Sequence, residues 1–266
     1  MQIRMVKPKL GQVFLTDFNI IKKIMNSLDV SSTDHFIEVG CGDGILTEAL
    51  LQLNVPLTVI EIDSYCIENT KKRLGDEASI HWICDDVLKV DFFLFKSPLK
   101  LVANIPYYIS AKLIQMLVKY KTVFSDITIM IQKEFAQKCV ARPYQKVYTS
   151  LSVFTQYHFQ IDYLFDVSKR CFSPMPTIDS SVIRLTPNQR LYDDDALIFE
   201  RIVTACFWGK RKKLSTSLRK NPYCLFTIDI RDIIAIKGLL SKRADQLDIN
   251  EYQYVADQLK AYIILE

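Results

Sequence analysis

A short apolar segment that runs directly into a glycine-rich loop constrains the fold of this chain more than any other feature. Residues 36–39 have the composition of a buried strand, and Gly40-Cys41-Gly42-Asp43-Gly44 follows without a break. An amphipathic helical pattern then begins at Ile45. Because glycine lets the backbone turn sharply and approach a ligand closely, a strand, a glycine loop and a helix in this order indicate a nucleotide-binding site.

The second expected strand, residues 57–60, ends at Glu61, 21 residues after Gly40. An acid at this point can accept hydrogen bonds from ribose hydroxyl groups. Asp43 would repel a pyrophosphate on the loop, and the third glycine comes one residue earlier than in dinucleotide-binding loops. The charges therefore favour a cofactor that has a ribose but no phosphate, and S-adenosyl-L-methionine is such a cofactor.

Strands and helices alternate along the first half of the chain. Further strands are expected at 80–83, 99–103 and 127–131, with helical patterns between them. This alternation predicts a parallel, doubly wound α/β sheet. Residues 150–165 are aromatic and β-branched, so they are expected to form a strand, and the last strands, ending with residues 181–185, should pair antiparallel at one edge of the sheet.

The pattern changes after Pro187. Residues 195–208, 212–220, 230–240 and 249–264 all have helical periodicity. The sequence therefore predicts two domains, a sheet domain over residues 1–187 and a small all-helical domain over residues 188–266.

A rigid polar corner follows the expected strand at 99–103. Asn104 and Pro106 stop the strand, and Tyr107 adds an aromatic face. An amide, bare backbone carbonyls and a ring can together hold a planar group that carries an amine. Asp86, after the strand at 80–83, could accept from the amine of an adenine. Asparagine and proline also occur in ordinary turns, and aspartate also caps helices, so both readings stay open on the residues alone.

Basic residues are concentrated in two segments. The net charge is +4, yet residues 1–12 and 204–221 carry three and six basic side chains without any acid. The rest of the chain is acidic, so a polyanionic partner is expected. The basic loop beside Phe207 and Trp208 is expected to contact RNA phosphates, although a solvated helix end is the common alternative. The residues concerned are Lys210, Arg211, Lys212, Lys213 and Arg219.

The seven cysteines are scattered and form no Cys-x-x-Cys pair. No apolar segment has the length of a secretion signal or a membrane span, so the sequence predicts reduced thiols, no metal site and a cytoplasmic protein without membrane contact. The three histidines, His35, His81 and His158, lie beside none of the motifs and are interpreted as structural.

Six motifs occur in an order and spacing that resemble the rRNA adenine N6,N6-dimethyltransferase family, small-subunit (KsgA) type. They cover residues 7–187 strongly and the helical tail more loosely. The resemblance implies a class I S-adenosylmethionine-dependent methyltransferase (Rossmann-like) sheet with a small all-helical C-terminal domain. The motifs are Gly11-Gln12-Val13-Phe14-Leu15, Glu38-Val39-Gly40-Cys41-Gly42-Asp43-Gly44, Glu61-Ile62-Asp63, Asn104-Ile105-Pro106-Tyr107, Gln132-Lys133-Glu134 and Phe172-Ser173-Pro174-Met175-Pro176-Thr177-Ile178-Asp179-Ser180.

The resemblance also implies roles for single residues. Catalytic positions would be Asn104, Ile105, Pro106, Tyr107 and Phe172. Cofactor-binding positions would be Gln12, Val13, Leu15, Gly40, Gly42, Glu61, Ile62, Asp86 and Asn104. Asn104 and a neighbouring carbonyl would hold the adenine N6 hydrogens, while Tyr107 and Phe172 would stack on the base, so that no strong general base is required.

Two branches of this family differ in substrate. The first dimethylates two adjacent adenosines in the 3′-terminal hairpin of small-subunit (16S) rRNA during small-subunit biogenesis. The second modifies large-subunit (23S) rRNA and confers macrolide resistance. Gln132-Lys133-Glu134 and the basic segment 209–218 resemble the first branch more closely, so a monomer that binds a small-subunit precursor is expected. A non-catalytic RNA-binding assembly factor and a DNA adenine methyltransferase are the remaining alternatives.

Two positions depart from the pattern of the family. Val13 stands where an asparagine is usual, and Tyr108 stands where asparagine or histidine is frequent. Neither change removes a group that the expected chemistry requires.

Overall fold

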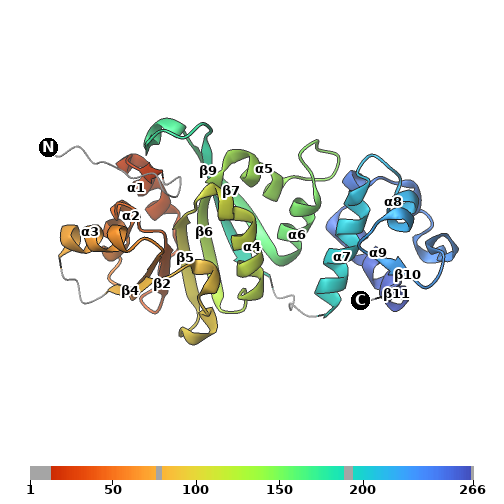
Figure 1. The fold of residues 1–266 in the computed structure, drawn as a ribbon, viewed down its shortest axis with the longest axis horizontal. Helices are drawn as coiled ribbons and strands as arrows, with labels where there is room; N and C mark the ends of the chain where they lie inside the picture. Colours follow the sequence, from red (N-terminus) through yellow and green to blue (C-terminus); the bar gives the residue numbers. More distant parts are fainter. Residues whose placement is uncertain (1–12, 76–79, 189–193, 265–266) are drawn as a thin grey trace. The chain divides into compact units, whose positions relative to one another are not determined.

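The computed structural model describes residues 13–75, 80–188 and 194–264 (Figure 1). The chain divides into two compact units. Unit 1 consists of Met1–Ala136 and Asp162–Pro187, and unit 2 consists of Gln137–Ile161 and Asn188–Glu266. No helix within the described residues is long and apolar enough to cross a membrane.

Unit 1 is built on a seven-stranded sheet with the strand order β4-β3-β2-β5-β6-β9-β7. The five strands from β4 to β6 are parallel, and β9 pairs antiparallel with β6. The structure thus confirms the doubly wound sheet with an antiparallel pair toward one edge. The strands are β2 (His35–Val39), β3 (Leu57–Glu61), β4 (Ile80–Cys84), β5 (Leu99–Asn104), β6 (Phe124–Gln132), β7 (Phe159–Val167) and β9 (Ser180–Pro187).

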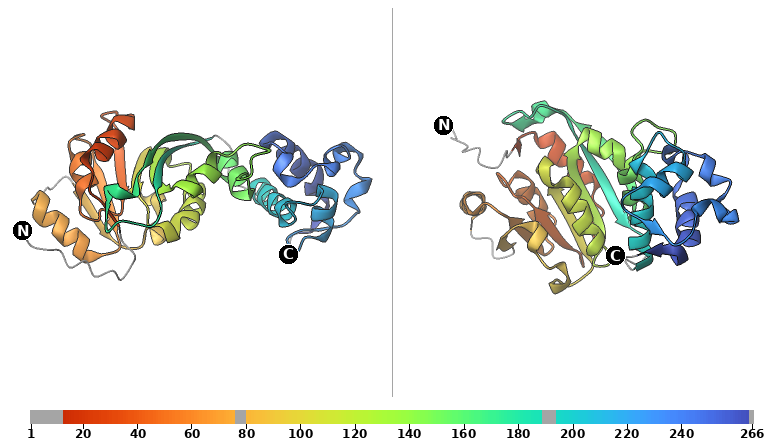
Figure 2. Two further views of the ribbon diagram at one scale, coloured as in Figure 1. Left: turned by 90° about the horizontal axis from the view of Figure 1, so that it is seen from above. Right: turned by 45° about the vertical axis from the view of Figure 1, so that its right-hand side comes forward.

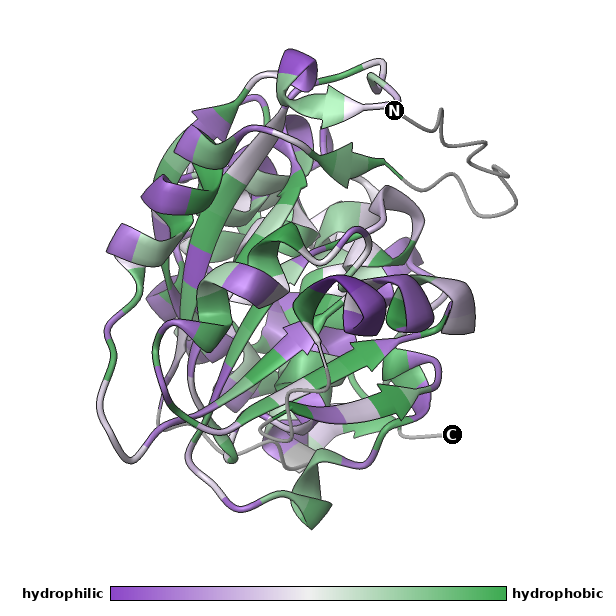
Figure 3. Ribbon diagram, turned by 90° about the vertical axis from the view of Figure 1, so that its left-hand side faces the viewer, coloured by the Kyte–Doolittle hydropathy of each residue, from purple (hydrophilic) through white to green (hydrophobic). Residues whose placement is uncertain are grey.

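Helices cover both faces of this sheet. Buried residues of α1, α2 and α3 share one hydrophobic cluster with sheet residues such as Phe36, Val59 and Val102. The connection from β5 through α4 to β6 crosses the sheet in the direction opposite to the connections from β2 to β3 and from β3 to β4. Because such connections are right-handed, α4 lies on the other face. The helices are α1 (Phe18–Ser27), α2 (Ile45–Leu51), α3 (Ser64–Leu74), α4 (Ser110–Lys119) and α5 (Lys133–Val140). Figure 3 shows hydrophobic residues along the central strands and a mixture of both classes on the helices.

Strand order determines where a ligand can bind. β2 lies between β3 and β5, so the chain leaves β2 toward one side and later returns on the other side. Ligands of open α/β sheets bind at such a reversal, outside the carboxyl ends of the strands. The loops after β2, β3, β4 and β5 all lie at this edge because these strands are parallel.

Unit 2 is mainly helical, as expected, and α7 contacts α6, α8 and α9 (Figure 2). Its helices are α6 (Ser150–His158), α7 (Asp194–Trp208), α8 (Leu214–Lys220) and α9 (Ile249–Leu259), and β10 (Leu225–Phe226) pairs with β11 (Ile263–Ile264). The helix expected over 230–240 is instead three short 3-10 turns, Ile230–Asp232, Ile234–Ile236 and Leu239–Ser241. Other short 3-10 turns are Val87–Lys89, Phe92–Leu94, Tyr107–Ile109, Lys169–Cys171, Ala244–Gln246 and Lys260–Tyr262.

The expectation of a strand over residues 150–165 is wrong for its first half, because α6 occupies Ser150–His158. The amide of Thr149, the N-cap residue, donates to Ser152 Oγ at 2.9 Å at the start of this helix. Buried apolar residues do not distinguish a short helix from a strand when periodicity is weak, and here the helix packs into the core of unit 2. The strand begins only at Phe159.

The division into units assigns residues 137–161 to unit 2, whereas the sequence placed them in the sheet domain. The core of unit 2 contains Tyr148 and Tyr157 from this segment. The hydroxyl group of Tyr148 donates to the Leu247 carbonyl at 2.9 Å, and the ring of Tyr157 stacks on Phe199 at a centroid distance of 3.8 Å. The helical unit is therefore discontinuous in sequence.

Candidate active site

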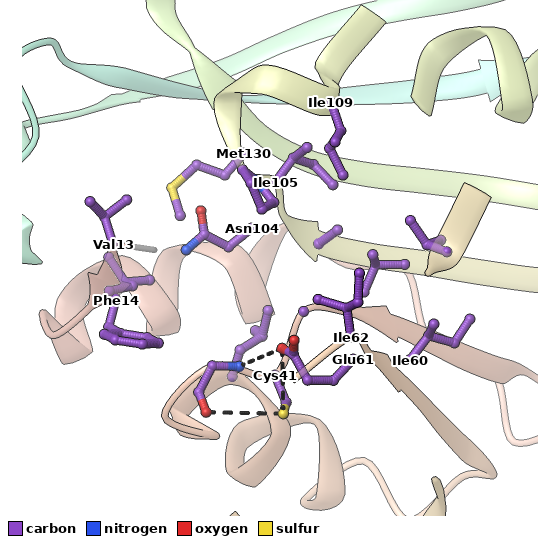
Figure 4. Close-up of a pocket in the computed structure, with 18 of the residues that line it drawn as sticks. Val13, Phe14, Cys41, Ile60, Glu61, Ile62, Asn104, Ile105, Ile109 and Met130 are labelled. Atoms are coloured by element: carbon purple, nitrogen blue, oxygen red, sulfur yellow. Dashed lines mark hydrogen bonds between the residues drawn. The ribbon is translucent and has the colours of Figure 1, made fainter. Parts of the chain in front are cut away.

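A cavity opens at the carboxyl ends of β2, β3, β4 and β5, where the strand order predicts a ligand site (Figure 4). Most of its lining comes from the end of the N-terminal arm, the glycine loop, the end of β3, the residues after β4 and the corner after β5, and Ile24 and Met130 add to it. Figure 4 shows the Asn104 amide and the Glu61 carboxylate on opposite sides of this opening.

The glycine loop has a conformation that other residues adopt only with strain. Gly40 has φ +80° and Gly42 has φ +52°, both in the left-handed region. The amide of Gly40 donates to the Ile60 carbonyl at 2.8 Å, which ties the loop to β3. A methyl group on Gly42 would lie 2.9 Å from the ring of Phe14. Phe14 therefore packs directly on the loop, in space that only a glycine leaves open.

Glu61 fixes the loop and lines the cavity at the same time. Its Oε1 accepts from the amide of Asp63 at 2.9 Å, and its Oε2 accepts from the amide of Gly42 at 3.3 Å. The residue is only 6% exposed, yet it belongs to the cavity wall. The thiol of Cys41 also donates to Oε2, at 3.9 Å, so Oε1 is the oxygen to which a hydroxyl group of a ligand can still donate.

Asp86 also has two functions in this structure. Its Oδ1 accepts from the amide of Leu88 at 3.0 Å and caps the 3-10 turn Val87–Lys89. The capping interpretation is therefore correct, and because Asp86 lines the cavity as well, its role toward an adenine amine stays a prediction.

The charge of the cavity wall fits a cationic ligand. Asp43, Glu61, Asp85 and Asp86 line it, while the described lining residues include no lysine or arginine. A pyrophosphate would be repelled by these carboxylates, whereas an amino group and a sulfonium would be attracted. S-adenosyl-L-methionine, which carries both cations together with a ribose and an adenine, therefore fits the residues that are present.

The polar corner forms where β5 ends at Asn104. The amide of Ile105 donates to the Met130 carbonyl at 3.0 Å, which continues the pairing with β6 by one residue. Pro106 then starts the 3-10 turn Tyr107–Ile109, and its carbonyl accepts from the amide of Ile109 at 3.1 Å. This turn holds Tyr107 in the cavity wall, and the Tyr107 hydroxyl group lies 2.9 Å from Ser180 Oγ.

Glu38, the first residue of the glycine motif, is fully buried beneath the loop. Neither of its carboxyl oxygens has a hydrogen-bond partner among the described residues. Burial, with a smaller contribution from the nearby Glu61 carboxylate, raises the pKa of Glu38 to about 8, so Glu38 is mostly protonated at neutral pH.

The structure brings together most of the residues that the sequence selected. Residues of the cavity wall include Val13, Leu15, Gly40, Gly42, Glu61, Ile62, Asp86, Asn104, Ile105, Pro106 and Tyr107. Gln12 lies outside the described residues. Phe172 is an exception, since it does not line the cavity and is only 4% exposed.

Phe172 has a different place because it lies in β8 (Phe172–Ser173), which pairs with β1 (Phe14–Leu15). Leu15 stands opposite Phe172 in this register. The strand pair holds the end of the arm over the cavity, and Phe172 is buried behind it rather than presented to a base. Stacking of Phe172 on a substrate therefore stays a prediction that needs a rearrangement of β1.

Sequence reasoning assigned no role to Phe14, Met130 or Ser180. Phe14 and Met130 line the cavity, and Ser180 contacts Tyr107. Phe14 and Ser180 belong to two of the six motifs, and membership in these motifs was the sequence signal that could have pointed to them. Nothing in the sequence separates Met130 from the other apolar residues of its strand.

The basic loop between α7 and α8 lies in unit 2, and one of its lysines differs from the rest. Lys210 Nζ donates to the carbonyls of Lys146 and Tyr148 at 2.9 and 2.7 Å. Arg211, Lys212 and Lys213 are exposed. Lys210 therefore holds two segments of unit 2 together, and the other three are the better candidates for phosphate contacts.

The topology and the cavity define the protein as a class I S-adenosylmethionine-dependent methyltransferase: a glycine loop after β2, an acid after β3 and a polar corner after β5 meet at the sheet reversal. The chain belongs to the ribosomal RNA adenine dimethylase family, whose model matches residues 3–257. It is accordingly an rRNA adenine methyltransferase that uses S-adenosyl-L-methionine.

Proteins similar to this chain support the assignment. Ribosomal RNA small subunit methyltransferase A of Prosthecochloris aestuarii is 33% identical over 257 residues, which cover 96% of this chain and 94% of that protein. The protein of the same name from Legionella pneumophila (strain Corby) is 35% identical over 254 residues, which cover 94% and 96%.

Solved structures show the same fold over nearly the whole chain. A dimethyladenosine transferase from Plasmodium falciparum matches with a TM-score of 0.83 and 25% identity, covering 94% of this chain and 99% of that one. The 23S rRNA methyltransferase ErmE matches with a TM-score of 0.72 and 23% identity, covering 93% and 99%.

Proposed function

We propose that this protein dimethylates N6 of two adjacent adenosines in the 3′-terminal hairpin of small-subunit rRNA. The observation that carries the chemistry is the Asn104-to-Tyr107 corner in the wall of an acidic cofactor cavity. The choice of the small subunit rests on relatives of 33 to 38% identity that are named small subunit methyltransferase A. The large-subunit alternative has support only from a shared fold at 23% identity.

The proposed cofactor site uses the residues of the acidic wall. Glu61 would accept the ribose hydroxyls, Asp86 would accept the adenine amine, and Gly40 and Gly42 would allow close approach of the backbone. When bound, S-adenosyl-L-methionine supplies an electrophilic methyl group on a sulfonium. Val13 and Leu15 would cover the bound cofactor from the side of the arm.

The corner after β5 would activate the target nitrogen by position alone. Adenine N6 is a poor nucleophile because its lone pair is delocalised into the ring. The Asn104 side-chain oxygen and the Ile105 carbonyl would accept the two N6 hydrogens, which favours a tetrahedral nitrogen with its lone pair directed at the methyl group. The Pro106 carbonyl already accepts from Ile109, which makes Ile105 the better second acceptor. The ring of Tyr107 would stack on the base.

Unit 2 would bind the RNA backbone. Arg211, Lys212, Lys213 and Arg219 are exposed and supply positive charge for rRNA phosphates. We propose that the physiological partner is a cytoplasmic precursor of the small ribosomal subunit and that the enzyme acts as a monomer.

The test uses S-adenosyl-L-methionine with a labelled methyl group. Undermethylated small ribosomal subunits and naked large-subunit rRNA are offered separately, and labelled adenines are mapped. Dimethyladenosine in the small-subunit 3′ hairpin is expected. Label confined to large-subunit rRNA would replace the proposal with the resistance-type activity, and cofactor binding without any transfer would point to a non-catalytic assembly factor.

A further inference from the structure

The hydroxyl group of Tyr107 reaches across the cavity edge to a residue far away in the sequence. It lies 2.9 Å from Ser180 Oγ, and either oxygen can be the donor. Ser180 is only 1% exposed, while Tyr107 belongs to the cavity wall. A buried serine that is hydrogen-bonded to the hydroxyl group of an active-site tyrosine is a candidate for control of the position of that tyrosine ring.

Ser180 is held firmly by the main chain around it. It is the first residue of β9 and pairs with Gln132 at the end of β6. The preceding carbonyl, that of Asp179, accepts from the amide of Lys133 at 3.1 Å. The Asp179 carboxylate accepts from the amide of Lys169 at 2.9 Å. Both strands and the adjoining loop thus fix the position of the serine oxygen.

Tyr107, by contrast, starts a 3-10 turn of three residues. The turn is closed by the bond from Ile109 to Pro106, and the Tyr107 carbonyl accepts from Ser110 Oγ at 3.1 Å. These contacts fix the backbone but leave the two side-chain torsions of the tyrosine open. The bond to Ser180 anchors the hydroxyl end of the side chain and so restrains the direction in which the ring points.

We propose that Ser180 is a positioning residue that, through the Tyr107 hydroxyl group, holds the Tyr107 ring in place against the target adenine. The inference rests on the proposed function, because the ring matters only if a base stacks on it. A ring held in one position keeps N6 aligned for both successive transfers, although the nitrogen gains a methyl group after the first. Reaction rates depend steeply on such alignment.

The neighbouring serine provides a matched control. Successive residues of a strand point to opposite faces, and Ser181 Oγ bonds to Asp166 Oδ1 at 2.8 Å and to the Tyr163 hydroxyl at 2.6 Å instead. Ser181 does not line the cavity. Removal of the Ser181 hydroxyl group also breaks partly buried hydrogen bonds, but the bond between Tyr107 and Ser180 remains.

The experiment compares Ser180→Ala, Tyr107→Phe, the double variant and Ser181→Ala on undermethylated small subunits. Ser180→Ala and Tyr107→Phe should each lower kcat by about tenfold, with KM for RNA and Kd for the cofactor within about twofold of wild type. The double variant should be no worse than either single variant, because both remove the same bond. Ser181→Ala should keep the wild-type kcat.

Three results would overturn the inference. They are an unchanged kcat in Ser180→Ala, a loss in the double variant equal to the product of the single losses, or an equal loss in Ser181→Ala. If Ser180→Ala folds poorly, Tyr107→Phe still tests the inference, because it removes the other partner of the same hydrogen bond. A wild-type enzyme that transfers no methyl group to the small subunit would refute the proposed function itself, which separates the two failures.

Discussion

Individual polar groups of the site differ in whether the protein already engages them. Both Glu61 oxygens and Oδ1 of Asp86 accept backbone amides. The Asn104 amide, by contrast, lines the cavity and has no hydrogen-bond partner among the described residues. A polar side chain without a hydrogen-bond partner in the protein is stabilised most by a hydrogen bond to a ligand or to water. This is the physical reason to assign base recognition to Asn104.

Asn104→Ala should therefore abolish the chemistry and spare the cofactor. The variant loses the acceptor for one N6 hydrogen, and we expect kcat to fall by about 100-fold or more because the nitrogen is no longer held in line. Cofactor Kd, measured by calorimetry, should stay close to wild type. Near-normal turnover would show that Asn104 does not hold the base.

Glu38 should make stability depend on pH. The unfolded carboxyl loses its proton near pH 4.5, whereas the folded one keeps it until about pH 8 because it is buried. Between these values the folded protein binds the extra proton, so this group lowers stability by about 1.4 kcal/mol for each unit of rising pH.

Glu38→Gln should remove this slope, since the amide cannot ionise. Thermal unfolding of both proteins from pH 5 to pH 8 is the measurement, and the exposed Glu68→Gln variant controls for the loss of one carboxyl group. Parallel stability curves for wild type and Glu38→Gln would contradict the assignment of the raised pKa.

Among the structural elements, the glycine loop and the short strand β1 depend on one another. Phe14 of β1 packs where a side chain on Gly42 would be, and β1 is itself held by β8. The arm can lie over the cavity only because the loop has no Cβ at this point. The end of the arm and the cofactor loop thus form one wall of the site.

Gly42→Ala should weaken cofactor binding by about tenfold or more. The substitution adds strain at φ +52° and pushes against the Phe14 ring. Gly75→Ala is the matched control, because Gly75 has φ +81° but open space around its Cβ position. Both variants should lose more than about 1 kcal/mol of stability, Gly42→Ala the more because of the contact with Phe14, and only Gly42→Ala should raise cofactor Kd. Equal Kd values in calorimetry would argue against the close packing of Phe14 on the loop.

At the scale of the whole molecule, the two units are not consecutive pieces of chain. The segment 137–161 leaves the sheet unit, supplies Tyr148 and Tyr157 to the core of unit 2, and returns as β7. A cut after Pro187 therefore separates residues that share one hydrophobic core.

A fragment of residues 1–187 should consequently expose the apolar side of α6. We expect it to bind a hydrophobic dye and to unfold with low cooperativity. A construction in which residues 1–136 are joined to 162–187 by a flexible linker should bind much less dye. Native-like cooperative unfolding of the 1–187 fragment would show that segment 137–161 folds without the rest of unit 2.

The charge of unit 2 should control RNA affinity through salt. Replacing Arg211, Lys212 and Lys213 by alanine should weaken rRNA binding and reduce the slope of log Kd against log salt by about 2, if each residue contacts one phosphate. Lys210→Met should instead lower Tm, since two carbonyls lose their donor, and should keep the slope. A slope unchanged in the triple variant would remove the loop from the interface.

The sequence alone determined the sheet, the position of the site and most of its wall. The glycine loop directly follows a strand, and Glu61 and Asn104 are each the last residue of one. Parallel strands bring their carboxyl ends to one edge, so local patterns were enough to predict that these groups meet. The weak periodicity of residues 150–158 was not enough, because apolar residues fit a buried helix as well as a strand.

Tertiary structure alone decided which members of a motif face the ligand. Phe172 is buried behind Leu15, Lys210 bonds to the chain at Lys146 and Tyr148, and Tyr107 is attached to Ser180. The last of these pairs is separated by 73 residues. Such contacts depend on how separate elements pack, and no periodic pattern in the sequence around either partner indicates that the two will meet. The sequence therefore predicted at which edge of the sheet the site lies, and the packing of the elements determined which residues face the ligand there.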